Sequence, residues 1–347
     1  MSGLAVCAVA GALFRSLHAP LPWLIGPLIA MAACRFAGLR LTAPMPAARI
    51  AQWCIGTTLG LYFTPSVAAI VVSRWPVLIA AASFSLVLAF VCGLWLARYT
   101  GMDRTTAFLA SVPGGAQEMA NIGERYGGKV DRIAIAQSLR ILLVVIIIPF
   151  SLTFSGVHGA DAFEGVHAAV ALPQLALLML CTGAGGLALH VLRLPNAWML
   201  GPLFVSIVLT AHGVAWSSMP GPMANAAQVL IGCNLGQRYE REFLRAAPRF
   251  VTMVCTSVMI GMVVSALFAL VLGWAADIAA PTMVLATAPG GIAEMSLTAR
   301  TLRLGVAIVV AAHVSRVVIL VTATAPIFRL ARWFVRRRDL RTGASPD

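Results

Sequence analysis

The stretch SVPGGAQEM at residues 111–119 returns as TAPGGIAEM at residues 287–295. In each copy a Pro-Gly-Gly sequence interrupts an apolar stretch, and a glutamate and a methionine follow it. Proline lacks an amide donor and clashes with the preceding turn, and glycine adds backbone freedom, so Pro-Gly-Gly ends a helix. The motif therefore predicts one broken helix in each half of the chain.

The doubled motif is part of a duplication that covers most of the chain. PWLIGPL at 22–28 returns as AWMLGPL at 197–203, and AQWCIGTTLG at 51–60 returns as AQVLIGCNLG at 227–236. The pairs Gln52/Gln228, Pro113/Pro289, Glu118/Glu294 and Arg140/Arg316 are all separated by 176 positions. This constant separation predicts two membrane repeats, 1–154 and 172–330, with a polar linker at 155–171 and a basic cytoplasmic tail at 331–347.

Composition places these repeats in a membrane. The 347 residues are 60% hydrophobic and 11% charged, with a mean hydropathy of +0.91. Soluble domains carry about 25% charged residues, so a water-soluble globular protein is excluded. Crossing a bilayer takes about 20 apolar residues in a helix, because lipid offers the backbone no hydrogen-bond partner. The predicted fold class is an all-α polytopic membrane protein. Its apolar stretches lie at about 2–17, 20–38, 47–63, 75–97, 105–124, 131–154, 172–191, 195–213, 222–237, 250–274, 281–299 and 303–328.

The arginines predict that the two repeats are inverted. The formal net charge is +13, and basic residues accumulate in cytoplasmic loops. In each of four pairs of equivalent loops, one half carries most of the arginines. The first half has more in two pairs: Arg35, Arg40 and Arg49 against none at 212–226, and Arg98 and Arg104 against none near Asp277. The second half has more in the other two: four at 238–249 against Arg74 alone, and six at 329–341 against none at 155–167. Parallel repeats would place the charge in equivalent loops instead.

Inversion requires an odd number of crossings in each half, whereas each half has six apolar segments. The fifth segment, which Pro-Gly-Gly breaks, is predicted to be re-entrant. This arrangement has about ten transmembrane helices and two re-entrant segments, with both termini in the cytoplasm, and Arg300 and Arg303 are its one misfit. In the alternative, a different segment does not cross and the fifth crosses as a broken helix.

The broken segments are the predicted binding site. Broken backbone at membrane depth is tolerated only where protein or a watery cavity satisfies it, and a carboxylate there is costly enough to suggest function. Paired broken segments in inverted halves are typical of the substrate and ion sites of secondary transporters. The predicted site residues of the two motifs are Pro113, Gly114, Gly115, Gln117, Glu118 and Met119, and Pro289, Gly290, Gly291, Glu294 and Met295. In the alternative, Pro-Gly-Gly is a packing kink and each glutamate lies at the interface.

Two arginines within apolar segments extend this site. Arg140 and Arg316 each follow their glutamate by 22 residues. They either bind an anionic substrate or neutralise the glutamates, because a charge inside the bilayer usually has a partner. Gln137 and its counterpart His313 lie one turn earlier on nearly the same face. His313 is either a proton carrier or a structural residue.

Two glutamines complete the predicted site. Gln52 and Gln228 lie on helices with four-residue glycine spacing, Gly56/Gly60 and Gly232/Gly236, which permits close helix contact. They either line the same cavity or only pack. The seven cysteines and six histidines are scattered without ligand spacing, so we expect no metal, no cofactor and no catalytic residues.

The PGGAQEM and PGGIAEM motifs, together with PWLIGP and AWMLGP, resemble the AbrB-type duplicated bacterial membrane protein family over nearly the whole chain. The resemblance implies that the prolines, glycines, glutamates and methionines of both motifs are family-typical. It also implies inverted halves with broken helices, by analogy with cation/proton antiporters. Two labels of family members, transition-state regulator and ammonia monooxygenase, conflict with the residues. An oxygenase needs clustered ligands and a DNA-binding regulator needs a basic soluble module.

The expected function is ion-gradient-driven secondary transport of a small polar solute, for which an anion is one option. The partners are that solute, a coupling ion (proton or sodium) and the lipid bilayer, without nucleic acid, and a homodimer is one option. The expected location is the bacterial inner membrane. The alternative is a membrane sensor that binds a ligand without transporting it and affects gene expression indirectly. An enzyme is not expected.

The inverted topology predicts that the linker and the C-terminus lie on opposite sides of the membrane. Alkaline phosphatase, which is active only outside the cytoplasm, should be active when fused within linker 155–171 and inactive when fused at the C-terminus. A fluorescent reporter that folds only in the cytoplasm should give the opposite pattern. Equal signals at both points would contradict inversion.

Overall fold

A computed structural model describes residues 2–39, 41–42, 45–157, 159, 169–239, 248–320 and 322, and in these residues it is helical without any strand. Most of the predicted linker and the whole basic tail lie outside the described residues. For Ser2, Met45, Ala116 and Gln117 only the backbone is described. The all-α fold class is confirmed.

The first repeat follows the predicted segments closely. Its helices are α1 (Ser2–Ser16), α2 (Pro22–Phe36), α3 (Met45–Gly60), α4 (Pro65–Ser73), α5 (Trp75–Thr100), α6 (Arg104–Ser111), α7 (Ala116–Arg125) and α8 (Val130–Phe154). α5 ends at Gly101, whose φ of 68° suits glycine, and Asp103 caps α6 by accepting a 2.8 Å hydrogen bond from the Thr106 amide. The short helix α4 was not among the predicted segments.

The second repeat has the same order of helices. They are α9 (Leu172–Val191), α10 (Ala197–Ala211), α11 (Gly221–Gly236), α13 (Pro248–Ala276), α14 (Ala280–Thr287), α15 (Ile292–Thr301) and the helix Val306–Leu320. Each corresponds to a helix of the first repeat, α9 to α1 and Val306–Leu320 to α8. The counterpart of α4 would fall at residues 241–249, of which 241–247 lie outside the described part of the chain and 248–249 begin α13.

Four described helices are long and apolar enough to span a membrane: α5, α8, α9 and α13. The pair α3 and α4, bent by 88° at the break between them, would make a fifth. Other predicted crossings fall on apolar helices of about 15 residues, such as α2 and α10, which rise only about 22 Å. The polytopic membrane fold is therefore supported, and the number of about ten crossings stays a prediction.

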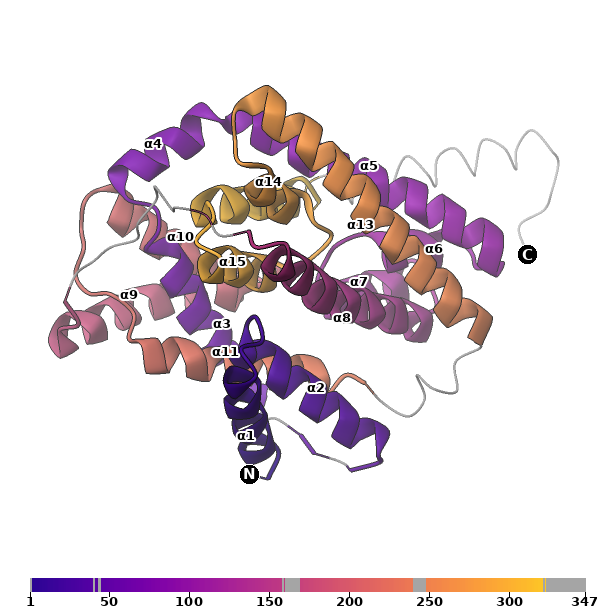
Figure 1. Ribbon diagram of the computed structural model, residues 1–347, viewed down its shortest axis with the longest axis horizontal. Helices are drawn as coiled ribbons and strands as arrows, with labels where there is room; N and C mark the ends of the chain where they lie inside the picture. The colour runs from indigo at the N-terminus through magenta and orange to yellow at the C-terminus, as the bar shows by residue number, and fades with distance from the viewer. Residues whose placement is uncertain are drawn as a thin grey trace.

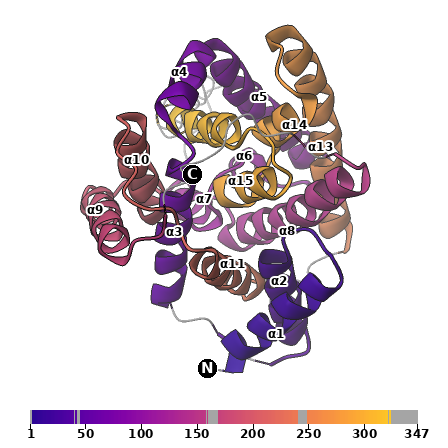
Figure 2. The same ribbon diagram turned by 60° about the vertical axis from the view of Figure 1, so that its left-hand side comes forward.

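The equivalent helices α5 and α13 pack against each other in opposite directions (Figures 1 and 2). Four contacts define the pairing: Arg74 with the Ala276 carbonyl, Phe84 stacked on Phe268 with 3.7 Å between ring centroids, Cys92 beside Gly261, and Arg249 with the Tyr99 carbonyl. Residue numbers rise along α5 as they fall along α13. Because both helices can span a membrane, this antiparallel pairing agrees with an inverted duplication.

Glycines join the two halves at two equivalent places. A Cβ on Gly56 of α3 would overlap the carbonyl oxygen of Met199 in α10, and a Cβ on Gly232 of α11 would overlap that of Leu24 in α2. Only glycine allows backbones this close. Each half therefore inserts its third helix against the second helix of the other half, and the two repeats are interlocked.

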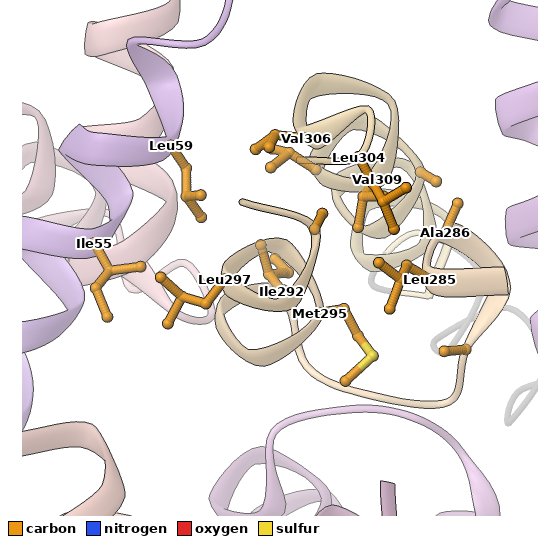
Figure 3. Packing of buried hydrophobic residues seen from close by; sticks show 14 of the residues in the cluster. Ile55, Leu59, Leu285, Ala286, Ile292, Met295, Leu297, Leu304, Val306 and Val309 are labelled. Atoms are coloured by element: carbon orange, nitrogen blue, oxygen red, sulfur yellow. The ribbon is translucent and has the colours of Figure 1, made fainter. Parts of the chain in front are cut away.

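The main core lies where the second broken segment meets this interlocked group. In both views α14 and α15 lie toward the middle of the molecule, with α9 and α10 at the left and α1 and α2 below (Figures 1 and 2). Ile55 and Leu59 of α3 lie beside Ile292 and Leu297 of α15, and all four side chains are almost fully buried (Figure 3). The second broken segment is thus held inside protein rather than exposed to lipid.

We predict that Gly232→Ala destabilises the protein by about 1–3 kcal/mol, because the new methyl group forces α11 away from α2. Gly221→Ala is the matched control on the same helix, since a Cβ there meets nothing within 4 Å. Thermal unfolding of both purified variants in detergent measures the difference. Equal melting temperatures for the two variants would show that the close contact is absent.

Candidate functional site

Each Pro-Gly-Gly sequence separates two short helices. In the first half α6 ends at Ser111, Val112 is extended, and α7 begins after Gly115. In the second half α14 ends at Thr287, Ala288 is extended, and α15 begins after Gly291. The predicted breaks are therefore present at equivalent positions. Such a break leaves carbonyl groups of the first helix without their usual helical partners.

The two arginines supply donors for these carbonyl groups. Arg140 donates from Nη1 to the Val112 carbonyl at 2.7 Å and from Nη2 to the Gly114 carbonyl at 3.3 Å. The same two bonds recur in the second half, where Arg316 donates to Ala288 at 2.9 Å and to Gly290 at 2.5 Å. Both arginines are almost fully buried. Neither of the two predicted roles describes this contact, in which the arginines hold the broken backbone in place.

The residues one turn earlier serve the same purpose. Gln137 donates from Nε2 to the Leu109 carbonyl at 2.6 Å and to the Val112 carbonyl at 2.9 Å. His313 places Nε2 3.0 Å from the Leu285 carbonyl, at the position equivalent to Leu109. Because an amide and an imidazole make the same contact in the two halves, the structural interpretation of His313 is favoured over the proton carrier.

The two glutamates occupy the first turn of the second short helix, where the helix dipole favours a negative charge. The Glu118 carboxylate accepts hydrogen bonds from the backbone N–H groups of Gly115 and Asn196, so the first turns of α7 and α10 converge on it. The bond to Gly115 corresponds to the carboxylate half of a capping box, since glycine has no side chain to complete it. Glu294 is 8% exposed and interacts electrostatically with Arg238, Arg140 and Arg316.

The methionines of the motif pack against the glycines of the breaks. Met119 and Met295 are buried, and their side chains lie against Gly114 and Gly290, where a Cβ would be 2.7 Å from a methionine carbon. The absence of a side chain at each glycine makes room for the methionine. Their role is therefore packing that shapes the break.

A cavity lies between α5, α13 and the two breaks. It is lined by Ser85, Leu88, Ala89, Cys92, Leu96, Ala110, Ser111, Pro113, Arg140, Val254, Ser257, Val258, Gly261, Thr287 and Pro289. Both motif prolines and one motif arginine reach it. The two Pro-Gly-Gly segments thus border one shared space.

The other predicted site residues lie outside this lining. Glu118 and Glu294 are on the far helices of their breaks, and Gln52 and Gln228 lie on α3 and α11 near the interlocked glycines. Gln228 is buried and Gln52 is half-buried. The Gln117 side chain is outside the described part of the structure. In the structure each arginine therefore lies against its own break, whereas the two glutamines lie elsewhere.

Sequence reasoning missed the serines of α5 and α13, of which Ser85 and Ser257 line the cavity and Ser265 lies outside its lining. Ser85 and Ser265 both donate to the Thr287 carbonyl, at 3.5 Å and 2.7 Å. The signal was present as small residues at four-residue spacing on both long helices, a pattern that marks close helix packing. On α13 these residues are Ser257, Gly261, Ser265, Ala269 and Gly273, and on α5 they are Ala81, Ser85, Ala89 and Gly93.

We predict that His313→Gln retains stability and function, because glutamine makes the same contact at the equivalent position in the first half. His313→Leu should cost about 1–3 kcal/mol, because it leaves the buried Leu285 carbonyl without a donor. Thermal unfolding compares the two variants with the parent protein. If His313→Gln removed a pH dependence that the parent protein has, the proton-carrier interpretation would be restored.

Comparisons with known proteins agree with the doubled motif. Residues 4–332 match the family described as "Transition state regulatory protein AbrB". The chain is 28% identical to "Uncharacterized protein YhjN" of Bacillus subtilis (strain 168) over 94% of this chain and 91% of that protein. It is 25% identical to "Putative regulator AbrB" of Escherichia coli (strain K12) over 94% of each chain. Because the family match covers nearly all 347 residues, the chain belongs to the AbrB family.

Proposed function

We propose that this chain is a secondary transporter that moves a small polar, anionic solute across a membrane by means of an ion gradient. The observation that carries the proposal is the shared cavity, in which Pro113 and Pro289 from two equivalent broken helices face the same space. In secondary transporters such paired breaks expose helix ends and backbone groups to a substrate near the middle of the bilayer.

The cavity has the one-sided form that alternating access requires. It lies along residues 85–96 of α5 and 254–261 of α13. Just beyond it on both helices, the stacked rings of Phe84 and Phe268 fill the interface. In an inverted duplication, the end of the α5–α13 interface that holds the cavity is equivalent to the end that the stacked rings fill. If the two halves exchanged conformations, the filled end would open and the cavity end would close.

The glutamates are the proposed sites of the coupling ion. Glu294 is buried and interacts electrostatically with three arginines, and Glu118 lies at two helix N-termini. A carboxylate in such a place can exchange a proton or bind sodium while the arginines and amides limit the cost of its charge. Each glutamate also stabilises its own helix start, which links the state of the carboxylate to the geometry of the break.

The second candidate is a membrane sensor that binds the solute without transporting it. It is favoured by the printed name of the Escherichia coli relative, which describes a regulator. Both candidates require the same cavity, and they differ only in whether the ligand crosses the membrane. A solute flux therefore separates them.

We predict gradient-dependent uptake into proteoliposomes of solutes that first raise the melting temperature of the purified protein. Uptake under an imposed pH or sodium gradient should fall at least tenfold in Glu118→Gln and Glu294→Gln, because glutamine cannot gain or lose the coupling charge. Glu124→Gln is the matched control on α7, since Glu124 is exposed. It should retain uptake.

Two results would contradict the transport proposal. One is saturable binding of a solute without any flux under either gradient, which would favour the sensor. The other is unchanged uptake in both glutamate variants, which would leave the motif carboxylates without a coupling role.

A further inference from the structure

We infer that the cavity between α5 and α13 binds a small organic monoanion, with its anionic group beside Arg140 and its apolar body between the two long helices. This inference rests on the transport site proposed above and adds the class of its substrate. It also separates Arg140, which faces the ligand, from Arg316, which has the same place in the other half.

Among the described residues that line the cavity, Arg140 is the one that carries a charge. Its side chain is 5% exposed, and its Nε, which is buried, has no hydrogen-bond partner among the described residues. Two of its Nη donors are used by the Val112 and Gly114 carbonyls, so the guanidinium is already fixed in place. Glu294 lies outside the described lining, and its single charge acts on Arg238 and Arg316 as well as on Arg140. A buried cation that retains a free donor beside a cavity attracts an anion.

The rest of the lining selects the remainder of the ligand. Ser85, Ser111 and Ser257 place hydroxyl groups on it, and Thr287 adds another. The other walls are mostly apolar: Leu88, Ala89, Leu96, Ala110, Pro113, Val254, Val258, Gly261 and Pro289. One cation in the described lining matches one negative charge. A dianion such as a dicarboxylate would leave its second charge against apolar walls.

The equivalent position in the other half does not offer this site. Arg316 donates to Ala288 and Gly290 as Arg140 does to its own break, but it is not in the cavity lining. Phe268, the counterpart of Cys92, stacks on Phe84 instead. The anion site is therefore present once, on the open side.

Cys92 reports on occupancy because it lines the cavity, whereas the half-buried Cys255 on α13 does not. We predict that benzoate and butyrate slow the reaction of Cys92 with N-ethylmaleimide at least fivefold in the purified full chain, and leave Cys255 unchanged. Benzamide, the neutral counterpart of benzoate, should not protect, and succinate should protect less. Peptide mass spectrometry measures the labelling of each cysteine in the same sample.

Two variants test the position of the ligand. Val258→Phe should remove the protection by benzoate, because the added ring occupies the cavity, whereas Met259→Phe on the exposed face of α13 should not. Arg140→Lys keeps the charge and loses the fixed fork of donors, so it should weaken protection by benzoate about tenfold more than Arg316→Lys does.

Equal protection by benzamide and benzoate would overturn the inference. The absence of protection by any monoanion at about 10 mM, a concentration above the roughly 1 mM dissociation constant of a weak ligand, would overturn it as well. Protection by palmitate alone would assign the cavity to lipid and would overturn it too. Labelling requires no transport, so protection without flux contradicts only the transporter. Flux of an organic acid without Cys92 protection contradicts only this site.

Discussion

The fold depends on satisfying backbone carbonyl groups that two broken helices leave inside the protein. Water is scarce there, and an unpaired buried carbonyl costs about 1–3 kcal/mol. Arg140 and Arg316 each supply two donors across a separation of 26–28 residues, and Gln137 and His313 add a further one or two. The chain therefore uses its buried arginines for a structural reason first. In the proposed site, the charge of Arg140 is also available to a ligand.

The packing of the two halves decides which arginine borders the cavity. Because α5 and α13 pack antiparallel, both breaks meet the same interface, and glycine contacts between α3 and α10 and between α11 and α2 interlock the halves. One end of the α5–α13 interface is filled by stacked rings and the other end holds the cavity. Two arginines with identical backbone contacts thus have different surroundings. The repeated sequence does not reveal this difference, because the two arginines occupy equivalent positions in it. The difference is the basis of the proposed one-sided access.

Local chemistry made the helices and their breaks predictable, and long-range packing made the rest unpredictable. The apolar stretches and Pro-Gly-Gly located every described helix except α4, which follows α3 after an 88° bend. The constant spacing of 176 residues identified the duplication. The sequence could not show that Arg140 donates to the Val112 carbonyl, because an anionic substrate and a glutamate were both chemically reasonable partners for a buried cation. It also gave no distance between Ser85 and Thr287, which lie 202 residues apart, so the cavity could not be placed.

The antiparallel pairing of α5 and α13 is the claim on which the shared cavity and the inverted repeat both rest. Disulfide cross-linking in native membranes tests it directly, with cysteines introduced in pairs. Phe84→Cys with Phe268→Cys should cross-link efficiently, because the two rings stack in the structure. Phe84→Cys with Gly261→Cys should not, because Gly261 lies opposite Cys92, two helical turns away. Native Cys92 with Gly261→Cys should cross-link as well, because Cys92 lies beside Gly261, and the two proper pairs together fix the antiparallel direction. Cross-linking of Phe84→Cys with Gly261→Cys and of Cys92 with Phe268→Cys, without either proper pair, would mean that the helices run parallel and would contradict the account.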